Sequence, residues 1–401
     1  MAPHFEGPDD APTAIDLFSG PGGNTEGLLR AGINVVAAWE TAAAERYTYH
    51  VRHSEPNYIA QHGDASEVDP SKVPDDLDVV FGSPPCQGLS AAGGEVDPED
   101  PRNELAFAPG KWVRATRPRL VILENVVGLQ DLHGPIHEAV VADLVDAGYD
   151  VETVKLNAAA YGVPQIRERV FIVGVRADQP RPGTWQPPIV VADGGGTAAQ
   201  VSASAYGPDG MAGYRTARED LEDLPRPLPS ATPEGDDVHA SIDGMLAYRD
   251  NHNDVHRVDP HSTAKPVERD GETVFVPPNH VATAHQRSTR ERMAEMLLGH
   301  SGSSVTKRRL HPDEPAPTIT VSNGSPPVHY QGQSPNHPDR PLEQVRRLTV
   351  REVARLQTFD DAYTFAGTKQ EQYRQVGNAV PPLLTSHLAA HYRETVLDPG
   401  R

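Results

Sequence analysis

The fold is decided at residues 13–27, which read TAIDLFSGPGGNTEG. The apolar residues 13–18 predict a short buried strand, and residues 24–31 predict a helix. The small residues between them predict a turn that brings backbone amides close to a nucleotide-like ligand. The dinucleotide fingerprint G-x-G-x-x-G is not met, because position 25 is Thr. The loop alone is therefore equally consistent with a tight turn that binds no ligand.

The same alternation of strand and helix continues along the first half of the chain. Apolar runs predict further strands at 33–39, 58–61, 77–81, 120–123, 151–156 and 170–175, and helices at 42–53, 103–115 and 136–147. Strands that alternate with helices, each ending in an acidic, Gly or Pro loop, are typical of a doubly wound α/β sheet. We therefore predict a doubly wound, Rossmann-like α/β domain.

The composition and the periodic patterning of the sequence change after Arg176. Residues 177–340 are rich in Pro, Gly, Asp and His, and regular patterning returns only in the predicted helices 345–357 and 383–392. We predict a catalytic, cofactor-binding domain over 1–176, completed by 368–401. Residues 177–367 are predicted to form a second, smaller and irregular domain with a hinge.

Two acidic residues follow the predicted strands next to the Gly-rich loop. Glu40 ends the second strand, where a carboxylate can accept hydrogen bonds from ribose hydroxyls. Asp64 ends the third strand, where it can accept from an exocyclic amine. Together with the loop they predict an adenosine pocket that has no phosphate-binding P-loop. This favours S-adenosylmethionine over NAD or ATP.

A second group of residues suggests nucleophilic chemistry. Cys86, the only cysteine, follows a buried strand in the rigid sequence GSPPCQGLS, residues 82–90, and Glu124 closes a later strand. A thiolate at Cys86 could attack a substrate ring, and positive charge from Arg167 or Arg169 would favour the thiolate form. A carboxylic acid at Glu124 could donate a proton to a nitrogen of that ring. Taken singly, a buried structural cysteine, a loop-capping Glu and solvated arginines are the commoner readings.

Composition limits the class of protein. One cysteine allows neither an internal disulfide nor a cysteine-based zinc site. The sequence has no apolar run of about 18 residues and no amino-terminal signal pattern, so we expect a cytoplasmic protein without a membrane span. The net charge is −20, with 31 Asp, 25 Glu and 30 Arg but only 6 Lys. Excess acid with little lysine predicts adaptation to high salt, which would not forbid a polyanionic partner.

The ordered set of motifs resembles the DNA (cytosine-5) methyltransferases of the prokaryotic type. The matching segments stand in the order of that family at similar spacing, and they are residues 16–27, 82–90, 124–126, 161–169, 347–349 and 375–382. The resemblance covers most of residues 13–175 and 345–392. It implies methyl transfer from S-adenosylmethionine to C5 of a cytosine in double-stranded DNA, flipped out of the duplex.

The resemblance also implies roles for the catalytic residues. Cys86 would add to C6 of the cytosine, and Glu124 would protonate or hydrogen-bond N3. Arg167 and Arg169 would hold the flipped base and its neighbouring phosphate, with Arg167 at O2. Loss of the C5 proton would then expel Cys86 by β-elimination.

Cofactor contacts follow from the same resemblance. Phe18 would stack on adenine, Glu40 would bind ribose, and Asp64 with Ala65 would bind the adenine. The amino-acid end of the cofactor would lie against the loop, at Ser19, Gly20, Gly22 and Gly23. The residues that would close the site are Pro84, Leu105, Asn378 and Ala379. Thr41 departs from the family pattern, in which many relatives carry a larger residue on the adenine side.

Residues 177–345 correspond to the target-recognition region of the family. Residues 285–309 carry six cations against Glu291 and Glu295, a net charge of +4 that suits phosphate contact but also suits a solvated helix. The predicted DNA contacts are Gln87, Ser90, Arg287, Arg290, Lys307, Arg308 and Arg309. His252 and His256 have a zinc-like spacing without a third ligand, so no metal is predicted.

Two other functions remain open at this point. One is a methyltransferase that modifies a tRNA cytosine, and the other is a regulator without catalysis, although Cys86 and Glu124 are both present. We expect a monomer at the nucleoid, either with a cognate restriction endonuclease or acting alone. The target sequence cannot be read from the chain.

Overall fold

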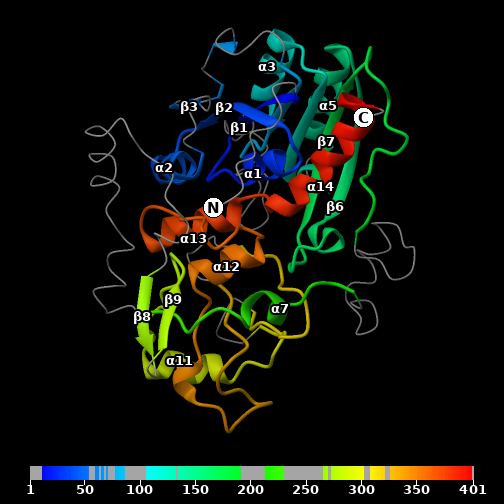
Figure 1. Ribbon diagram of the computed structural model, residues 1–401. Coiled ribbons are helices and arrows are strands. Elements are labelled where there is room, and N and C mark those ends of the chain that lie inside the picture. Colours follow the sequence, from blue (N-terminus) through cyan, green and yellow to red (C-terminus); the bar gives the residue numbers. More distant parts are fainter. Residues whose placement is uncertain are drawn as a thin grey trace, which may run out of the picture.

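The computed structural model has a twisted sheet with helices on both faces and a second, less regular region beneath it (Figure 1). It describes residues 11–53, 59–62, 65–66, 69–70, 77–85, 105–131, 134–190, 213–229, 265–269, 272–301, 308–320 and 326–399. Cys86, Asp64, Gln87, Ser90, Lys307, His252 and His256 lie outside these ranges, so the predictions for them stay predictions.

The sheet has seven strands in the order β3-β2-β1-β4-β5-β7-β6. The first five in this order are parallel to one another, whereas β7 runs antiparallel to both β5 and β6. The strands are β1 (Thr13–Leu17), β2 (Asn34–Glu40), β3 (Ile59–His62), β4 (Val79–Gly82), β5 (Leu120–Val126), β6 (Tyr149–Asn157) and β7 (Glu168–Arg176). The predicted α/β class is confirmed, with a mixed rather than a purely parallel sheet.

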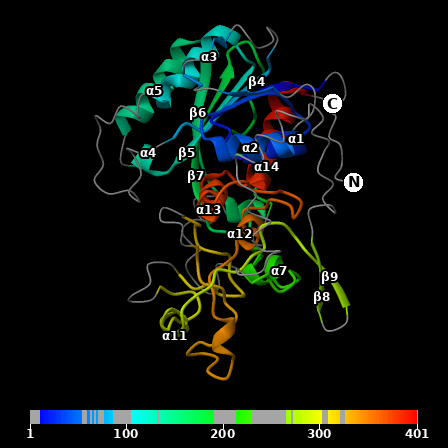
Figure 2. The same cartoon turned by 90° about the vertical axis from the view of Figure 1, so that its left-hand side faces the viewer.

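Helices cover the sheet on both sides (Figure 2). On one face lie α1 (Gly23–Arg30), α2 (Ala43–Arg52) and α14 (Pro382–Tyr392), and on the other α3 (Ala108–Thr116) and α5 (Gly134–Asp146). Each face has its own apolar core, with Leu28 and Leu388 in one and Trp112 and Leu144 in the other. Short α4 (Gly128–Asp131) follows β5, and η3 (Ala158–Tyr161) follows β6.

The region below the sheet contains little regular structure. A two-stranded antiparallel sheet of β8 (Lys265–Arg269) and β9 (Glu272–Val276) lies at its edge. Three short helices accompany it, and these are α7 (Ala217–Leu221), α11 (Arg287–Ala294) and η5 (Leu342–Gln344). The division into domains at residues 176–177 and 367–368 remains a prediction.

The C-terminal helices return to the sheet. They are α12 (Val350–Leu356), α13 (Lys369–Asn378), α14 and the π-helical turn η6 (Arg393–Leu397). The helix predicted over 345–357 starts only at Val350, because Thr349 and Glu352 form a capping box that fixes its first turn. No helix was predicted over α13, because its residues are mostly polar and include a glycine. The helix nevertheless begins with its own capping box, formed by Thr368 and Glu371.

Glycine allows α1 and α14 to touch. A Cβ atom built on Gly27 would lie 2.7 Å from the carbonyl oxygen of Pro382, and one on Gly23 would lie 2.5 Å from that of Val380. Such distances leave no room for a side chain, so the two helices pack backbone against backbone. The C-terminal segment thus completes the first core. Within the described ranges, no helix is long and apolar enough to cross a bilayer.

Candidate active site

Residues 18–23, here called the cofactor loop, connect β1 to α1 in a backbone conformation that needs glycine. Gly20 has φ 55° and Gly22 has φ 101°, and Phe18 also has a positive φ of 60°. The amide of Ser19 donates to the carbonyl of Trp39 at 3.0 Å, which holds the loop against β2. A Cβ built on Gly20 would meet no atom within 4 Å, so the loop faces open space there.

Glu40 lies beside this loop, as the sequence predicts. Its two carboxylate oxygens accept from the amide of Gly20 at 3.0 Å and from that of Ala42 at 2.8 Å. The register explains the contact, since Leu17 at the end of β1 pairs with Trp39 on β2. The oxygen bonded to Ala42 also accepts from the hydroxyl of Thr41 at 3.4 Å, whereas the oxygen bonded to Gly20 keeps a lone pair for a hydroxyl donor. The position therefore fits a ribose.

Asp16 supports the loop from inside the protein. It is fully buried, and one carboxylate oxygen accepts from the hydroxyl of Thr25 at 2.8 Å, while the other has no partner. Burial raises the pKa of this carboxyl to about 7, although its hydrogen bonds with Thr25 and Asn24 favour the charged form. Gly22 gives α1 no side-chain cap, and Asp16 on β1 contacts the first turn of this helix through the hydroxyl of Thr25.

A cluster of aromatic side chains packs beside the cofactor loop. Trp39 and Trp112 are in contact, with ring centroids 4.4 Å apart, and Phe18 packs against the same core. The indole of Trp112 donates to the carbonyl of Ala65 at 2.8 Å, which fixes the residue predicted to contact adenine. Leu105 is partly buried in the turn that precedes α3.

Glu124 is paired with Arg169, with 3.0 Å between the carboxylate and the guanidinium Nε. In the antiparallel register Glu124 lies opposite Phe171, and Arg169 is two residues along β7, so both side chains share one face. Glu124 is 8% exposed. Burial raises the pKa of this carboxyl, and the positive charges of Arg169 and Arg167 oppose that rise in part.

The loop that leads to Cys86 begins at the same edge. Gly82 pairs with Leu123, so Ser83 and Pro84 lie beside the Glu124–Asn125 end of β5, and Asn125 donates to the carbonyl of Pro84 at 3.4 Å. The side chain of Asn24 donates to the hydroxyl of Ser83 at 2.8 Å. This bond joins the start of α1 directly to the cysteine loop.

Arg167 is placed differently from the prediction. It is 1% exposed, and its guanidinium donates to the carbonyls of Ile319, Asn378 and Ala379, at 3.4, 3.5 and 3.0 Å. This side chain ties β7 to the C-terminal segment, and it is Arg169 that reaches the Glu124 carboxylate. The assignment of Arg167 to the base oxygen O2 is therefore corrected, because its donors are directed at backbone carbonyls.

The basic segment 285–309 contains both exposed and buried arginines. Arg309 is fully buried and donates to the carbonyls of Met293, Gln331, Gly332 and Gln333, so its predicted contact with phosphate is wrong in this structure. Arg308 is exposed, and so is Arg287, which pairs with Glu291 at 2.9 Å. Arg290 donates to the carbonyl of Glu343.

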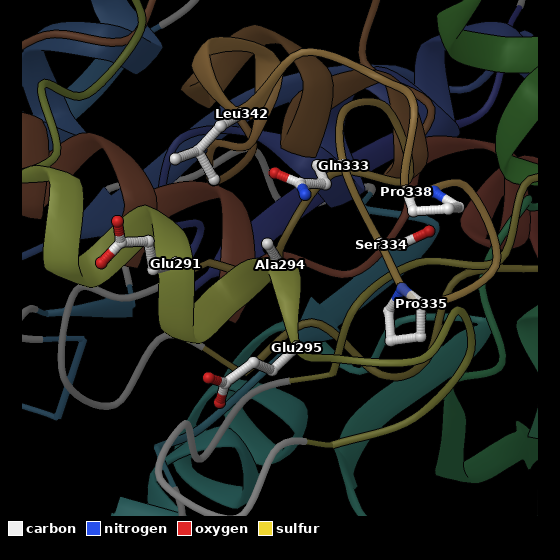
Figure 3. Close-up of a pocket in the computed structure, with 8 residues that line it drawn as sticks. All are labelled: Glu291, Ala294, Glu295, Gln333, Ser334, Pro335, Pro338 and Leu342. Carbon is white, nitrogen blue, oxygen red and sulfur yellow. The ribbon is translucent and has the colours of Figure 1, made fainter.

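A groove of about 310 Å³ lies beside this segment (Figure 3). Glu291, Ala294 and Glu295 of α11 form one side, and the opposite side is the loop from Gln333 to Leu342. Its acidic rim does not suit a phosphate backbone. In the ranges that the structure describes, no three His, Cys, Asp or Glu side chains gather as a metal site would need.

Several residues of the site were not singled out from the sequence. Asp16, Thr25 and Asn24 stand inside the motif, but nothing in the pattern showed that Asp16 bonds to Thr25 or that Asn24 reaches the cysteine loop. Tyr363 and His53, which border Gly22, come from distant segments. Only their three-dimensional neighbourhood identifies them.

The geometry defines a class of enzyme. A glycine loop with a ribose-type acceptor lies at the carboxyl edge of an α/β sheet, next to a buried carboxyl–guanidinium pair. The family profile described as C-5 cytosine-specific DNA methylase matches residues 13–394. The chain therefore belongs to this family, and it is a DNA (cytosine-5-)-methyltransferase.

Individual relatives agree with this membership. The chain is 31% identical to the type II methyltransferase M.AgeI of Thalassovita gelatinovora, over 94% of this chain and 97% of that protein. It is 29% identical to M.DdeI of Desulfomicrobium norvegicum, over 94% and 87%. Its fold matches a protein assigned as a prophage-encoded DNA modification methyltransferase of E. coli, with TM-score 0.64, 22% identity and coverage of 96% and 99%.

The buried carboxyl of Asp16 gives the first prediction. Because its pKa is raised from 3.8 to about 7, the folded protein binds an extra proton between these values, and the contribution of Asp16 to stability falls as pH rises through this window. An amide cannot ionise. The wild type should therefore lose stability relative to Asp16→Asn as pH rises. The difference between their free energies of unfolding should change by at most about 1.4 kcal/mol per pH unit.

Urea unfolding of both proteins at about pH 5 and about pH 7.5 measures this change. Asp150→Asn is the control, because Arg181 lowers the pKa of that exposed carboxyl and its titration lies below the window. A difference for Asp16→Asn that is the same at both pH values would contradict the prediction.

Proposed function

We propose that the enzyme transfers the methyl group of S-adenosylmethionine to C5 of a flipped cytosine in a specific duplex DNA sequence, through a covalent bond between Cys86 and C6. The observation that carries this proposal is the buried Glu124–Arg169 pair at the edge where the cysteine loop starts. The bond from Asn24 to Ser83 keeps that edge next to the cofactor loop. A nucleophile, an acid and a cofactor pocket would thus share one site.

The residues of the loop fit the proposed cofactor. Glu40 has acceptor capacity for ribose hydroxyls, and open space lies above Gly20. We assign adenine to Phe18, Ala65 and Asp64, and the amino-acid end to Ser19, Gly20, Gly22 and Gly23. Pro84, Leu105, Asn378 and Ala379 are assigned to the walls. When bound, S-adenosylmethionine supplies an electrophilic methyl group.

The residues of the chain would act on the base in sequence. The Cys86 thiolate forms a bond to C6, and the electron pair of the C5–C6 double bond moves into the ring, so that C5 becomes nucleophilic. Glu124, whose pKa is raised by burial, donates a proton or hydrogen bond to N3. Arg169 holds Glu124 and donates to O2. Once C5 carries the methyl group, water takes the C5 proton, and any proton that N3 received returns to Glu124. The electron pair of the C5–H bond re-forms the C5–C6 double bond and expels the Cys86 thiolate.

The DNA would lie against the recognition region. Arg287, Arg290 and Arg308 are proposed phosphate contacts, and Gln87, Ser90 and Lys307 are proposed on sequence alone. The curated relatives named above are type II methyltransferases, which supports a partner endonuclease acting on the same site. We further propose a monomer at the nucleoid and adaptation to high salt.

Cys86→Ala should abolish methyl transfer and leave cofactor binding largely intact, because alanine cannot form the bond to C6. Transfer of labelled methyl to unmethylated duplex DNA, with tRNA as a parallel substrate, measures the activity, and calorimetric titration measures cofactor binding. Turnover by the variant would refute the covalent mechanism. Label on tRNA alone would overturn the DNA substrate.

Glu124→Gln should lower kcat by about 10²- to 10⁴-fold, since an amide cannot transfer a proton to N3. The KM for S-adenosylmethionine should change little, because Glu124 faces the base. Glu152→Gln, an exposed residue of β6, is the matched control and should be active. A loss of less than about threefold in Glu124→Gln would remove Glu124 from the chemistry.

Arg308→Ala should weaken DNA binding and reduce the slope of log affinity against log salt by about 0.9, the share of one phosphate contact. Arg181→Ala removes the same charge from an exposed side chain paired with Asp150 and serves as control. Equal slopes for the wild type and Arg308→Ala would show that Arg308 does not contact phosphate.

A further inference from the structure

Tyr363 reaches the back of the cofactor loop from a distant part of the chain. It lies between α12 and α13, and its phenol donates to the carbonyl of Pro21 at 2.5 Å. The same hydroxyl lies 3.3 Å from Nε2 of His53. A Cβ built on Gly22 would be 2.7 Å from this hydroxyl and 2.8 Å from Nε2 of His53, so the loop rests directly on the two side chains.

This contact bears on the conformation of the loop. Gly22 is in the left-handed region at φ 101° and precedes α1 without a side-chain cap. A bond to the preceding carbonyl limits the rotation of the peptide between Pro21 and Gly22. The ring of Tyr363 is held in turn by Phe359 and Phe365, with centroids 4.7 and 5.3 Å away. The phenol therefore approaches from a rigid base.

Arg351 of α12 fixes the backbone that carries Tyr363. Its guanidinium is fully buried and donates to the carbonyls of Tyr363, Asp360 and Pro278, the last two at 2.6 and 3.0 Å. Pro278 follows β9, in the region predicted to recognise the target. One side chain thus joins that region to the tyrosine segment through three carbonyl groups.

Asn279 makes a second link between the same segments. Its side-chain amide donates to the carbonyl of Phe365 at 3.0 Å and accepts from its amide at 2.9 Å. The amide of Arg351 donates to the carbonyl of Asn279 at 3.2 Å. A continuous chain of buried hydrogen bonds, here called the strut, therefore runs from Pro278–Asn279 through Arg351 and Tyr363 to Pro21.

We propose that Tyr363 is a positioning residue for the cofactor loop, and that the strut makes the cofactor affinity of this loop depend on how the 278–279 turn is held. Neither end of the strut needs to touch the substrate for this effect. The loop and the turn lie on opposite sides of the predicted domain boundary, so the strut joins the two domains energetically as well as sterically. The inference rests on the proposed use of S-adenosylmethionine.

The test removes side-chain hydrogen-bonding groups and leaves the packing largely in place. Tyr363→Phe keeps the ring and loses the hydroxyl, and with it the bond to Pro21 and the 3.3 Å contact with Nε2 of His53. The affinity for S-adenosylmethionine should weaken, and its KM should rise, by about 3- to 10-fold, with kcat nearly unchanged. Titration calorimetry with S-adenosylmethionine and steady-state kinetics on duplex DNA measure both. Tyr373→Phe is the control, because its phenol donates at 2.6 Å to the carbonyl of Leu348, away from the loop.

The far end of the strut is tested separately. Asn279→Gly keeps a residue that tolerates φ 62° but loses both side-chain bonds to Phe365. It should also weaken cofactor affinity, by about 2- to 5-fold, and its effect should not add fully to that of Tyr363→Phe.

The outcomes separate the two proposals. If Tyr363→Phe changes cofactor affinity no more than Tyr373→Phe, the positioning role is overturned. If Asn279→Gly leaves cofactor affinity unchanged, or if the two effects are strictly additive, the strut is overturned. If the wild type does not bind S-adenosylmethionine at all, the cofactor proposal itself has failed.

Discussion

Close backbone approach at the start of α1 is the constraint on which the rest of the structure depends. Gly22, Gly23 and Gly27 each face a group from the last 40 or so residues of the chain at a distance that excludes a Cβ atom. Because these glycines admit Tyr363, Val380 and Pro382, segments from both ends of the chain pack together at the cofactor loop. The Gly-rich loop thus serves two purposes, since it leaves open space on its outer side at Gly20 and receives the C-terminal segment on its inner side.

Buried arginines organise the molecule in two different ways. Arg169 pairs with the carboxylate of Glu124 and holds it in place. Arg167, Arg309 and Arg351 instead donate to backbone carbonyls. Carbonyl groups satisfy guanidinium donors without neutralising the charge, and burial accordingly lowers the pKa of Arg309 and of Arg351 to about 10. Such arginines fix loops that have no regular structure. This explains how the described part of the irregular region keeps its shape with only the strands β8 and β9.

The sequence predicted the parts of the fold that local patterns encode. Alternating apolar runs placed the strands of the sheet to within a few residues, and the motif order placed Glu40 and Glu124 at the ends of two strands, β2 and β5, at the carboxyl edge of the sheet. What it could not predict depends on contacts over long separations. The role of Arg309 was mistaken because a cation in a basic run looks the same whether it faces solvent or four carbonyls. Arg167 and Arg169 are two residues apart, and only the register of β5 with β7 tells which one meets Glu124.

The acidic composition bears differently on the two kinds of charge in this enzyme. In molar salt the screening length is about 3 Å, so exposed contacts such as those proposed for Arg287 and Arg308 lose most of their attraction. The Glu124–Arg169 pair is about nine-tenths buried on both sides and is screened far less. Salt should therefore act on DNA association and leave the Glu124–Arg169 pair intact. If the protein works at high salt, its specificity must come from short-range contacts to bases more than from phosphate attraction, because only the former survive screening.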